Sequence, residues 1–196
     1  MKVLIAFECS GKVREAMRAA GHNAWSCDLQ QADDDSPHHI TGDASRAMVG
    51  DWDLIIMHPP CTALAVSGNA HYGTGKHLHH ERVKAIRWTM AVYEMAKQCA
   101  PMVAMENPVG VLPIKATQYI QPYQFGHYES KKTGLWLHNL PALVPTDIVE
   151  KPARGYWDNQ TPSGQNNLGP SANRAKIRSE TYSGIADAMA QQWGRI

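Results

Sequence analysis

The sequence lacks several features that would define its class at once. None of the four cysteines (Cys9, Cys27, Cys61 and Cys99) stands at a CxxC or zinc-binding spacing, which predicts free thiols in a reducing compartment. Charge of one sign is not in excess, because 19 Lys and Arg residues against 18 Asp and Glu residues leave a formal net charge of +1. A dedicated nucleic-acid module is usually more basic. The balance therefore neither requires nor excludes a polyanionic partner.

Long apolar runs are also missing. The N-terminal run, residues 2–7, is too short for the apolar region of a secretory signal and leads directly into a loop. No stretch approaches the length that a membrane-spanning helix needs. No repeat is visible along the 196 residues, a length that suits one domain with a sizeable core. We therefore expect a soluble, cytoplasmic protein that forms a single domain over residues 1–196.

What the sequence does contain is an alternation of short apolar runs and helical segments. Buried strands are predicted at residues 2–7, 22–29, 53–57 and 102–105. Helices are predicted at residues 10–21 and 81–98, with the Trp and Met positions of 88–95 in the core, and at 182–194. Strands separated by helices predict an α/β fold with a mostly parallel sheet and helices on both faces. The remaining segments are predicted to be loops at 30–42 and 69–80 and an irregular stretch at 139–180.

Unusual polar residues follow the predicted strands. In an open α/β sheet, ligands bind outside the carboxyl ends of the strands. The first loop opens a helix whose free N–H groups attract polar or negative ligand atoms, and Asp28 is placed to accept hydrogen bonds from ribose hydroxyls. These features predict a nucleoside-containing cofactor. Cys61, after Pro59-Pro60, is either a nucleophile or an inert core cysteine, and Glu106-Asn107-Pro108 follows the next strand.

Several stretches, in the same order, resemble motifs of the cytosine-C5 methyltransferases. The run DLIIMHPPCTALAVSG (53–68) resembles the family's nucleophile motif, and AMENPVGVL (104–112) resembles its Glu-Asn-Val motif. AFECSG (6–11) is similar to the cofactor loop, and GDAS (42–45) to the Gly-Asp that contacts the cofactor's adenine. More faintly, 129–137 resembles the basic motif, and 182–194 the final helix.

The resemblance implies the Rossmann-like class I fold of S-adenosylmethionine-dependent methyltransferases and a role for each matched residue. Cys61 would add as a thiolate to C6 of cytosine, so that C5 takes the methyl group of S-adenosylmethionine. Glu106 would hold and protonate N3, and burial beside the base would raise its pKa. The implied cofactor-binding residues are Phe7, Glu8, Cys9, Ser10, Gly11, Asp28, Asp43 and Pro59. The implied substrate-binding residues are Pro60, Asn107 and Lys131, and no metal is implied.

The chain also departs from the family's pattern. His58 and Pro60 stand where the family usually carries Gly and Phe or Ser, Cys9 replaces a Gly, and Ile185 stands where an Asn is expected. No room remains for a target-recognition domain, which favours a phage gene and help from a recognition partner or a homodimer. The expected substrate is cytosine in DNA. The alternatives are single-stranded nucleic acid, a free cytosine nucleotide, and a catalytically silent relative that only binds.

Two further clusters have competing interpretations. His71, His77, His79 and His80 crowd one Gly-rich loop, where a solvated loop is favoured over a metal site and a mobile lid is a third interpretation. The basic residues at 131–132 and 174–178 form either a solvated face or a phosphate contact.

Overall fold

The computed structural model describes residues 1–171 and 174–196, and its centre is a twisted seven-stranded sheet. The strand order is β3-β2-β1-β4-β5-β7-β6. All neighbours from β3 to β5 are parallel, whereas β7 runs antiparallel to both β5 and β6. This is the Rossmann order with an antiparallel strand placed between the last two strands. The bounds are β1 (Lys2–Ala6), β2 (Asn23–Asp28), β3 (His39–Thr41), β4 (Leu54–Met57), β5 (Met102–Pro108), β6 (Gln118–Ile120) and β7 (Thr133–His138).

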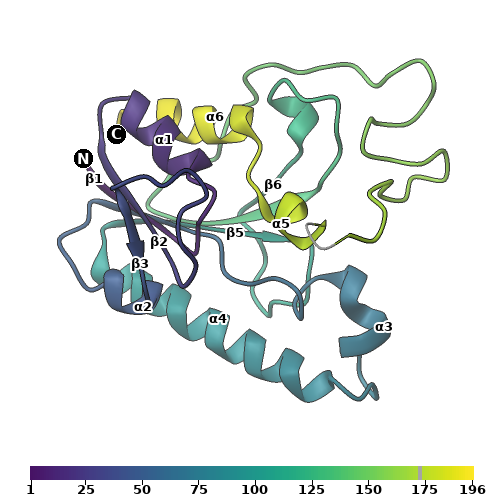
Figure 1. Cartoon of the computed structure of the whole chain (residues 1–196), viewed down its shortest axis with the longest axis horizontal. Coiled ribbons are helices and arrows are strands. Elements are labelled where there is room, and N and C mark those ends of the chain that lie inside the picture. The colour runs from purple at the N-terminus through teal and green to yellow at the C-terminus, as the bar shows by residue number, and fades with distance from the viewer. Residues whose placement is uncertain (172–173) are drawn as a thin grey trace.

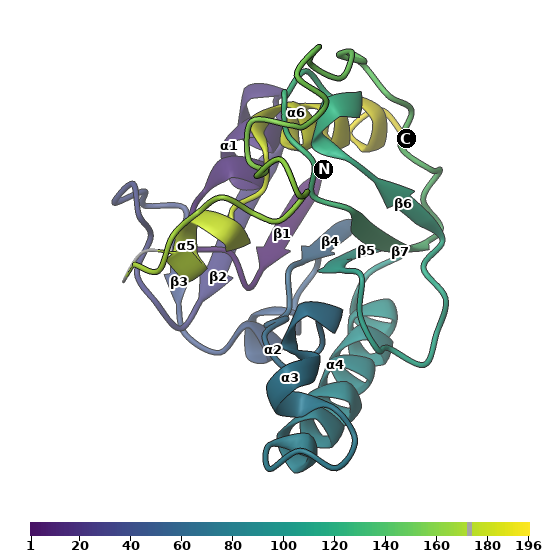
Figure 2. The same ribbon diagram turned by 90° about the vertical axis from the view of Figure 1, so that its right-hand side faces the viewer.

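Helices cover both faces of this sheet. Helices α1 (Lys12–Ala19) and α6 (Ser183–Trp193) lie side by side on one face, and α2 (Ala44–Ala47) and α4 (His79–Cys99) lie on the other, as both views show (Figure 1 and Figure 2). The short helical segments are η1 (Val66–Gly68), α3 (Asn69–Tyr72), η2 (Pro122–Gln124) and α5 (Arg174–Ser179). No helix among the described residues combines the length and the apolar character needed to span a bilayer.

Alternation along the strands divides the core between the two faces. In β1, Val3 and Ile5 pack with Met17 of α1 and Trp193 of α6. Leu4, between them, packs in the opposite cluster with side chains of α4. Because β1 and β4 are covered on both faces, every residue from Val3 to Ala6 and from Leu54 to Met57 is fully buried. This explains why these strands are continuous apolar runs rather than alternating ones.

The predicted α/β fold and its main elements are confirmed, and four local expectations are wrong. The predicted loop 30–42 contains the edge strand β3, and the predicted loop 69–80 contains α3 and the start of α4. Helix α5 lies within the stretch expected to be irregular, where residues 172–173 fall outside the described part. Trp88 is 40% exposed instead of being in the core. Its ring meets Phe7 edge-on, with centroids 5.4 Å apart.

Candidate active site

The candidate site lies where the order of the strands reverses, between β1 and β4. Ala6 pairs with Met57, and Met57 pairs with Met105, so β1 and β4 end at the same level, one residue before Glu106 of β5. The next residue after β4, His58, donates its backbone N–H to the Ala6 carbonyl at 3.0 Å. The loops after β1 and β4 therefore start side by side, with Glu106 of β5 next to them. In doubly wound sheets the crevice at this switch point is the usual place for a ligand.

A tight turn presents Cys61 at this crevice. The backbone N–H groups of Leu64 and Ala65 both donate to the Cys61 carbonyl at 2.9 Å. Val66 donates to the Val109 carbonyl at 3.1 Å, and this bond joins the turn to the segment after β5. Cys61 itself is partly buried, between the buried Pro59 and the exposed loop that follows. The sulfur is therefore held by a fixed backbone and is not sealed in the apolar core.

Arg82 of α4 holds the same turn in place, although nothing in its sequence context singles it out. The residue is 5% exposed. Its Nε donates to the Ala63 carbonyl at 2.7 Å, its Nη1 to Asn69 Oδ1 at 2.7 Å, and its Nη2 to the Ala65 carbonyl at 3.2 Å. These three bonds fasten the turn after β4 and the first residue of α3 to α4.

Glu106 interacts with His58 and with the charge of Lys131, which lies just before the neighbouring strand β7. His58 Nδ1 lies 3.3 Å from Glu106 Oε2, and the two side chains are 10% and 15% exposed. Burial raises the pKa of Glu106, but the hydrogen bond from His58, the Lys131 charge and the Thr133 hydroxyl outweigh it and leave the pKa below its usual value. The raised pKa expected from the sequence is therefore wrong. The expectation overlooked a hydrogen-bonding histidine and a lysine that come from other elements.

The thiol of Cys61 responds to the same charges. Burial and the negative charge of Glu106 raise the pKa of Cys61, while the positive charges of Lys131 and Arg178 lower it, and the net shift is upward. The structure thus places Cys61, Glu106 and Lys131 within electrostatic reach of one another. In the free protein at neutral pH, the thiol is held in its protonated form.

Asn107 links the two strand ends. Its Nδ2 donates to the Pro59 carbonyl at 3.1 Å. The Oδ1 atom of this buried side chain has no hydrogen-bond partner among the described residues. Pro60 is exposed and lines a hollow of about 510 Å³ with Thr62, Tyr72 and Trp88, between the turn and helices α3 and α4.

The loop after β1 differs from the expected open helix terminus. The carboxylate of the buried Glu8 accepts the N–H groups of Val13 at 2.8 Å and Arg14 at 3.3 Å, and the Ser10 hydroxyl donates to it at 3.3 Å. The free N–H groups expected at the start of α1 are therefore already occupied by this chain's own carboxylate. Gly11 has a φ of 71°, and a Cβ there would fall on the Arg14 guanidinium.

Arg14 is a second buried cation that sequence analysis missed. Its side chain is fully buried; Nη1 donates to Ser26 Oγ at 2.7 Å, Nε to Glu15 Oε1 at 2.8 Å, and Nη2 to Asp34. This network joins α1, β2 and the acidic loop after β2. The loop contributes Asp33, whose carboxylate lies 2.6 Å from Lys176 Nζ of α5 and 3.9 Å from Cys9 Sγ.

The residues expected to hold a nucleoside cofactor lie at this same edge of the sheet. Asp28 ends β2, and its charge helps to raise the pKa of Cys9, after burial and Asp33. Asp43 accepts the Ser45 N–H at 2.9 Å as the N-cap of α2. Ribose hydroxyls need acceptors and a cationic sulfonium needs negative charge, and Asp28 and Asp43 can supply both. The side chains present therefore fit S-adenosylmethionine at this edge.

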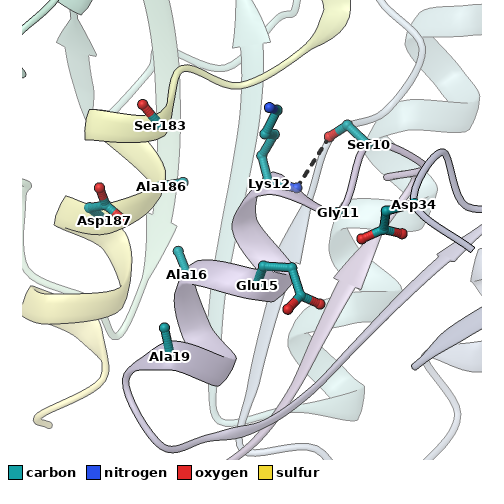
Figure 3. A pocket seen from close by; sticks show the side chains of 10 residues that line it. All are labelled: Ser10, Gly11, Lys12, Glu15, Ala16, Ala19, Asp34, Ser183, Ala186 and Asp187. Carbon is teal, nitrogen blue, oxygen red and sulfur yellow. Dashed lines mark hydrogen bonds between the residues drawn. The ribbon is translucent and has the colours of Figure 1, made fainter. Parts of the chain in front are cut away.

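A separate hollow lies between α1 and α6. It measures about 460 Å³, and Figure 3 shows Ala16 and Ala19 of α1 on the side toward α6, whereas Glu15 points to the other side, toward Asp34. Of the predicted site residues, only Ser10 and Gly11 line it. It is therefore a groove beside the strand-end site and not the site itself. No group of three or more His, Cys, Asp or Glu side chains in residues 1–171 and 174–196 is arranged to hold a metal.

Comparisons with known proteins identify fold relatives. No family model matches the chain, and no curated protein matches its sequence. A solved structure from E. coli, named as a DNA modification methyltransferase encoded within a prophage, matches with a TM-score of 0.53 and 14% identity, over 76% of this chain and 52% of its own. The S. pombe Dnmt2 methyltransferase matches with a TM-score of 0.44 and 17% identity, over 72% of this chain and 51% of that one. A mutant of Spodoptera frugiperda DNMT2 matches with a TM-score of 0.43 and 15% identity, over 78% of this chain and 55% of that one.

The chain thus spans about half the length of these structures. The first likeness, together with the strand order, confirms the Rossmann-like methyltransferase fold expected from the sequence. At such low identity it bears on the fold alone.

Proposed function

We propose that this protein transfers a methyl group from S-adenosylmethionine to C5 of cytosine in DNA, with Cys61 as the nucleophile and Glu106 as its partner at N3. The observation that carries the proposal is the meeting of a thiol and a carboxylate at neighbouring strand ends, beside the switch point of the sheet. The hydrogen bond from the Asn107 side chain to the Pro59 carbonyl joins the two strand ends. Cys61 and Glu106 are therefore positioned by the backbone on which they stand and not by flexible loops.

The electrostatics favour a thiol that is activated by its substrate. Before a base binds, the charge of Glu106 keeps Cys61 protonated. N3 of cytosine only accepts hydrogen bonds, so Glu106 must take up a proton to donate to it. That proton removes the negative charge of Glu106, whereas the positive charge of Lys131 remains. The pKa of Cys61 then falls and the thiolate forms next to C6. This coupling protects an unoccupied site from alkylation and oxidation.

The proposed methyl transfer requires a nucleophile at C6 of the base and a partner for N3. S-adenosylmethionine supplies an electrophilic methyl group. Cys61 adds to C6, which makes C5 nucleophilic, and Glu106 offsets the charge that develops at N3. After C5 is methylated and loses its proton, the bond between Cys61 and C6 breaks and the thiolate is released. Asp28 and Asp43 would hold the cofactor, and Lys131 would contact the substrate.

The test combines transfer with trapping. The protein is incubated with methyl-labelled S-adenosylmethionine and either duplex DNA, single-stranded DNA or dCMP, and separately with a DNA containing 5-fluorocytosine. We expect labelled 5-methylcytosine in DNA and a mass increase on the Cys61 peptide with the fluorinated DNA. Cys61→Ser should abolish both, whereas Cys99→Ser, on α4, should leave both intact. Methylation that persists in Cys61→Ser would refute the covalent route, and label on dCMP alone would refute DNA as the substrate.

A titration separates an enzyme from a silent relative. We expect calorimetry to detect S-adenosylmethionine binding at micromolar strength or tighter. Asp28→Ala should weaken it at least tenfold, while Asp51→Ala, on an exposed loop, should not. An absence of binding to the wild-type protein would overturn the proposal.

A further inference from the structure

Lys131 carries the positive charge on which the proposed chemistry depends, and its surroundings show how that charge is kept in place. The lysine is partly buried and lies just before β7, outside any helix or strand. Its charge acts to lower the pKa of both Cys61 and Glu106. Because the ammonium group stands on a flexible stem of four carbons, its position depends on the groups that contact it.

Those groups belong to the segment that leads into α6. Lys131 Nζ donates to the Glu180 carbonyl at 3.4 Å and lies 5.8 Å from the centre of the Tyr182 ring. A cation within about 6 Å of an aromatic ring is attracted by the negative face of the ring. The carbonyl and the ring therefore hold the ammonium group together, although they come from a distant part of the sequence.

Tyr182 is itself fixed from two sides. Its hydroxyl donates to Glu129 Oε2 at 2.5 Å, and its ring meets the His127 ring edge-on, with centroids 5.1 Å apart. His127 Nε2 in turn accepts the Gly184 N–H at 3.0 Å. A Cβ on Gly184 would fall 1.9 Å from the Phe125 carbonyl oxygen. The start of α6 is thus packed directly on this backbone, and the Tyr182 ring has a fixed place beside Lys131.

The same tyrosine separates two opposite charges. Glu129 and Lys131 are two residues apart and both are partly buried, where opposite charges attract more strongly than in water. Nevertheless, they make no ion pair in the part of the chain that the structure describes. The carboxylate contacts the Tyr182 hydroxyl, and the ammonium contacts the Tyr182 ring. An ion pair between them would offset the positive charge that reaches Cys61.

We propose that Tyr182 is a positioning residue that keeps the charge of Lys131 available to Cys61. Its ring holds the ammonium group, and its hydroxyl prevents Glu129 from forming an ion pair with that group. Burial and the charge of Glu129 raise the pKa of Tyr182, so the hydroxyl keeps its proton and remains a donor at neutral pH. This inference rests on the proposed function, because there the charge of Lys131 favours the thiolate that attacks the base.

Alkylation of Cys61 by iodoacetamide near pH 8, followed by mass spectrometry, tests this role. Tyr182→Phe keeps the ring but releases the Glu129 carboxylate, which can then pair with Lys131. We expect Cys61 to react about threefold more slowly than in the wild-type protein, because the rate follows the thiolate fraction. Adding Glu129→Gln to Tyr182→Phe should restore the rate. In Lys131→Met, the further change Tyr182→Phe should have no effect. Cys99 serves as the internal reference in each sample.

Tyr119→Phe is the matched control, because Tyr119 also lies beneath a lysine, with Lys132 Nζ 4.6 Å from its ring centre, and it should leave the rate unchanged. Circular dichroism verifies that each variant is folded. A wild-type rate in Tyr182→Phe, or a slow rate that Glu129→Gln does not restore, would overturn the positioning role. The alkylation uses neither DNA nor S-adenosylmethionine. A wild-type protein that traps no adduct on 5-fluorocytosine DNA would therefore refute the proposed function separately.

Discussion

Replacing Arg82 with methionine should loosen the turn that presents Cys61. In the native protein the guanidinium donates to two backbone carbonyls of that turn and to the Asn69 side chain. Methionine keeps an apolar stem of similar length but donates no hydrogen bond. The carbonyls of Ala63 and Ala65 would then lose their charged donor. The turn between β4 and α3 would be held mainly by its own backbone bonds.

The size of the effect follows from the number of bonds. A hydrogen bond to a charged group contributes about 1.5 kcal/mol at the low end of its range, so three of them amount to about 4 kcal/mol. Removal of a buried charge recovers part of this, because the guanidinium no longer has to be desolvated. We therefore expect the free energy of unfolding of Arg82→Met to fall by about 3 kcal/mol. For a chain of this length, that corresponds to a decrease in Tm of roughly 6–12 °C.

Urea unfolding followed by circular dichroism, with a thermal scan in parallel, measures this change. Arg87→Met is the matched control, since Arg87 is an exposed residue of the same helix, and it should change stability by less than about 0.5 kcal/mol. Arg82→Met should also make Cys61 more accessible to iodoacetamide. If Arg82→Met unfolds at the same urea concentration as the control, the three bonds contribute no net stability and the account of the turn is wrong.

Three further predictions follow from the site. Mass spectrometry should show that Cys61 is alkylated near pH 8 several-fold faster in Glu106→Gln and more slowly in Lys131→Met than in the wild-type protein, because Glu106 raises the thiol pKa and Lys131 lowers it. Equal rates in all three proteins would exclude an electrostatic effect of these two residues on Cys61. The pKa of Glu106 is lowered by folding, so its ionised form adds stability above the unfolded-state pKa, and acid titration should remove that stability from the wild-type protein but not from Glu106→Gln. Gly11→Ala should cost about 2–3 kcal/mol in urea unfolding, from a left-handed backbone and a clash with Arg14; a loss below about 0.5 kcal/mol would contradict it.

The strand ends could be predicted from the sequence because their signals are local. An apolar run followed by Pro-Pro-Cys marks both strand β4 and the point where it stops. The apolar run of β5 marks that strand as well, although the strand continues through Glu106-Asn107-Pro108 instead of ending before it. Parallel pairing then brings those end points to one edge of the sheet. Strand β3 gave no such signal, because three residues at the sheet edge need little apolar character. Strands β6 and β7 were missed because their pairing depends on partners many residues away.

The side chains that hold the site together were hidden for a related reason. Arg14 and Arg82 lie on helices where an arginine is ordinarily solvated, and only tertiary contacts reveal that both are buried. Glu8 seemed available to a ligand because its bonds to the start of α1 depend on the bend of the loop. His58 was noticed only as a departure from a motif. In each case the residue type was visible, but its partner came from another element.

The distribution of charge along the carboxyl edge of the sheet links these contacts to the proposed chemistry. The loops after β1, β2 and β3 carry mainly acidic side chains, namely Glu8, Asp28, Asp33, Asp34 and Asp43, whereas Lys131 and Lys132 directly precede β7. The Glu8 carboxylate already accepts an N–H group at the start of α1, so that helix terminus is not available to bind a phosphate. The acidic side chains at the same edge can instead accept hydrogen bonds from ribose hydroxyls and attract a sulfonium. Phosphates of a nucleic acid are instead favoured beside Lys131. In the proposed reaction, the two halves adjoin at the switch point, and Cys61 and Glu106 would act between a cationic methyl donor and an anionic substrate.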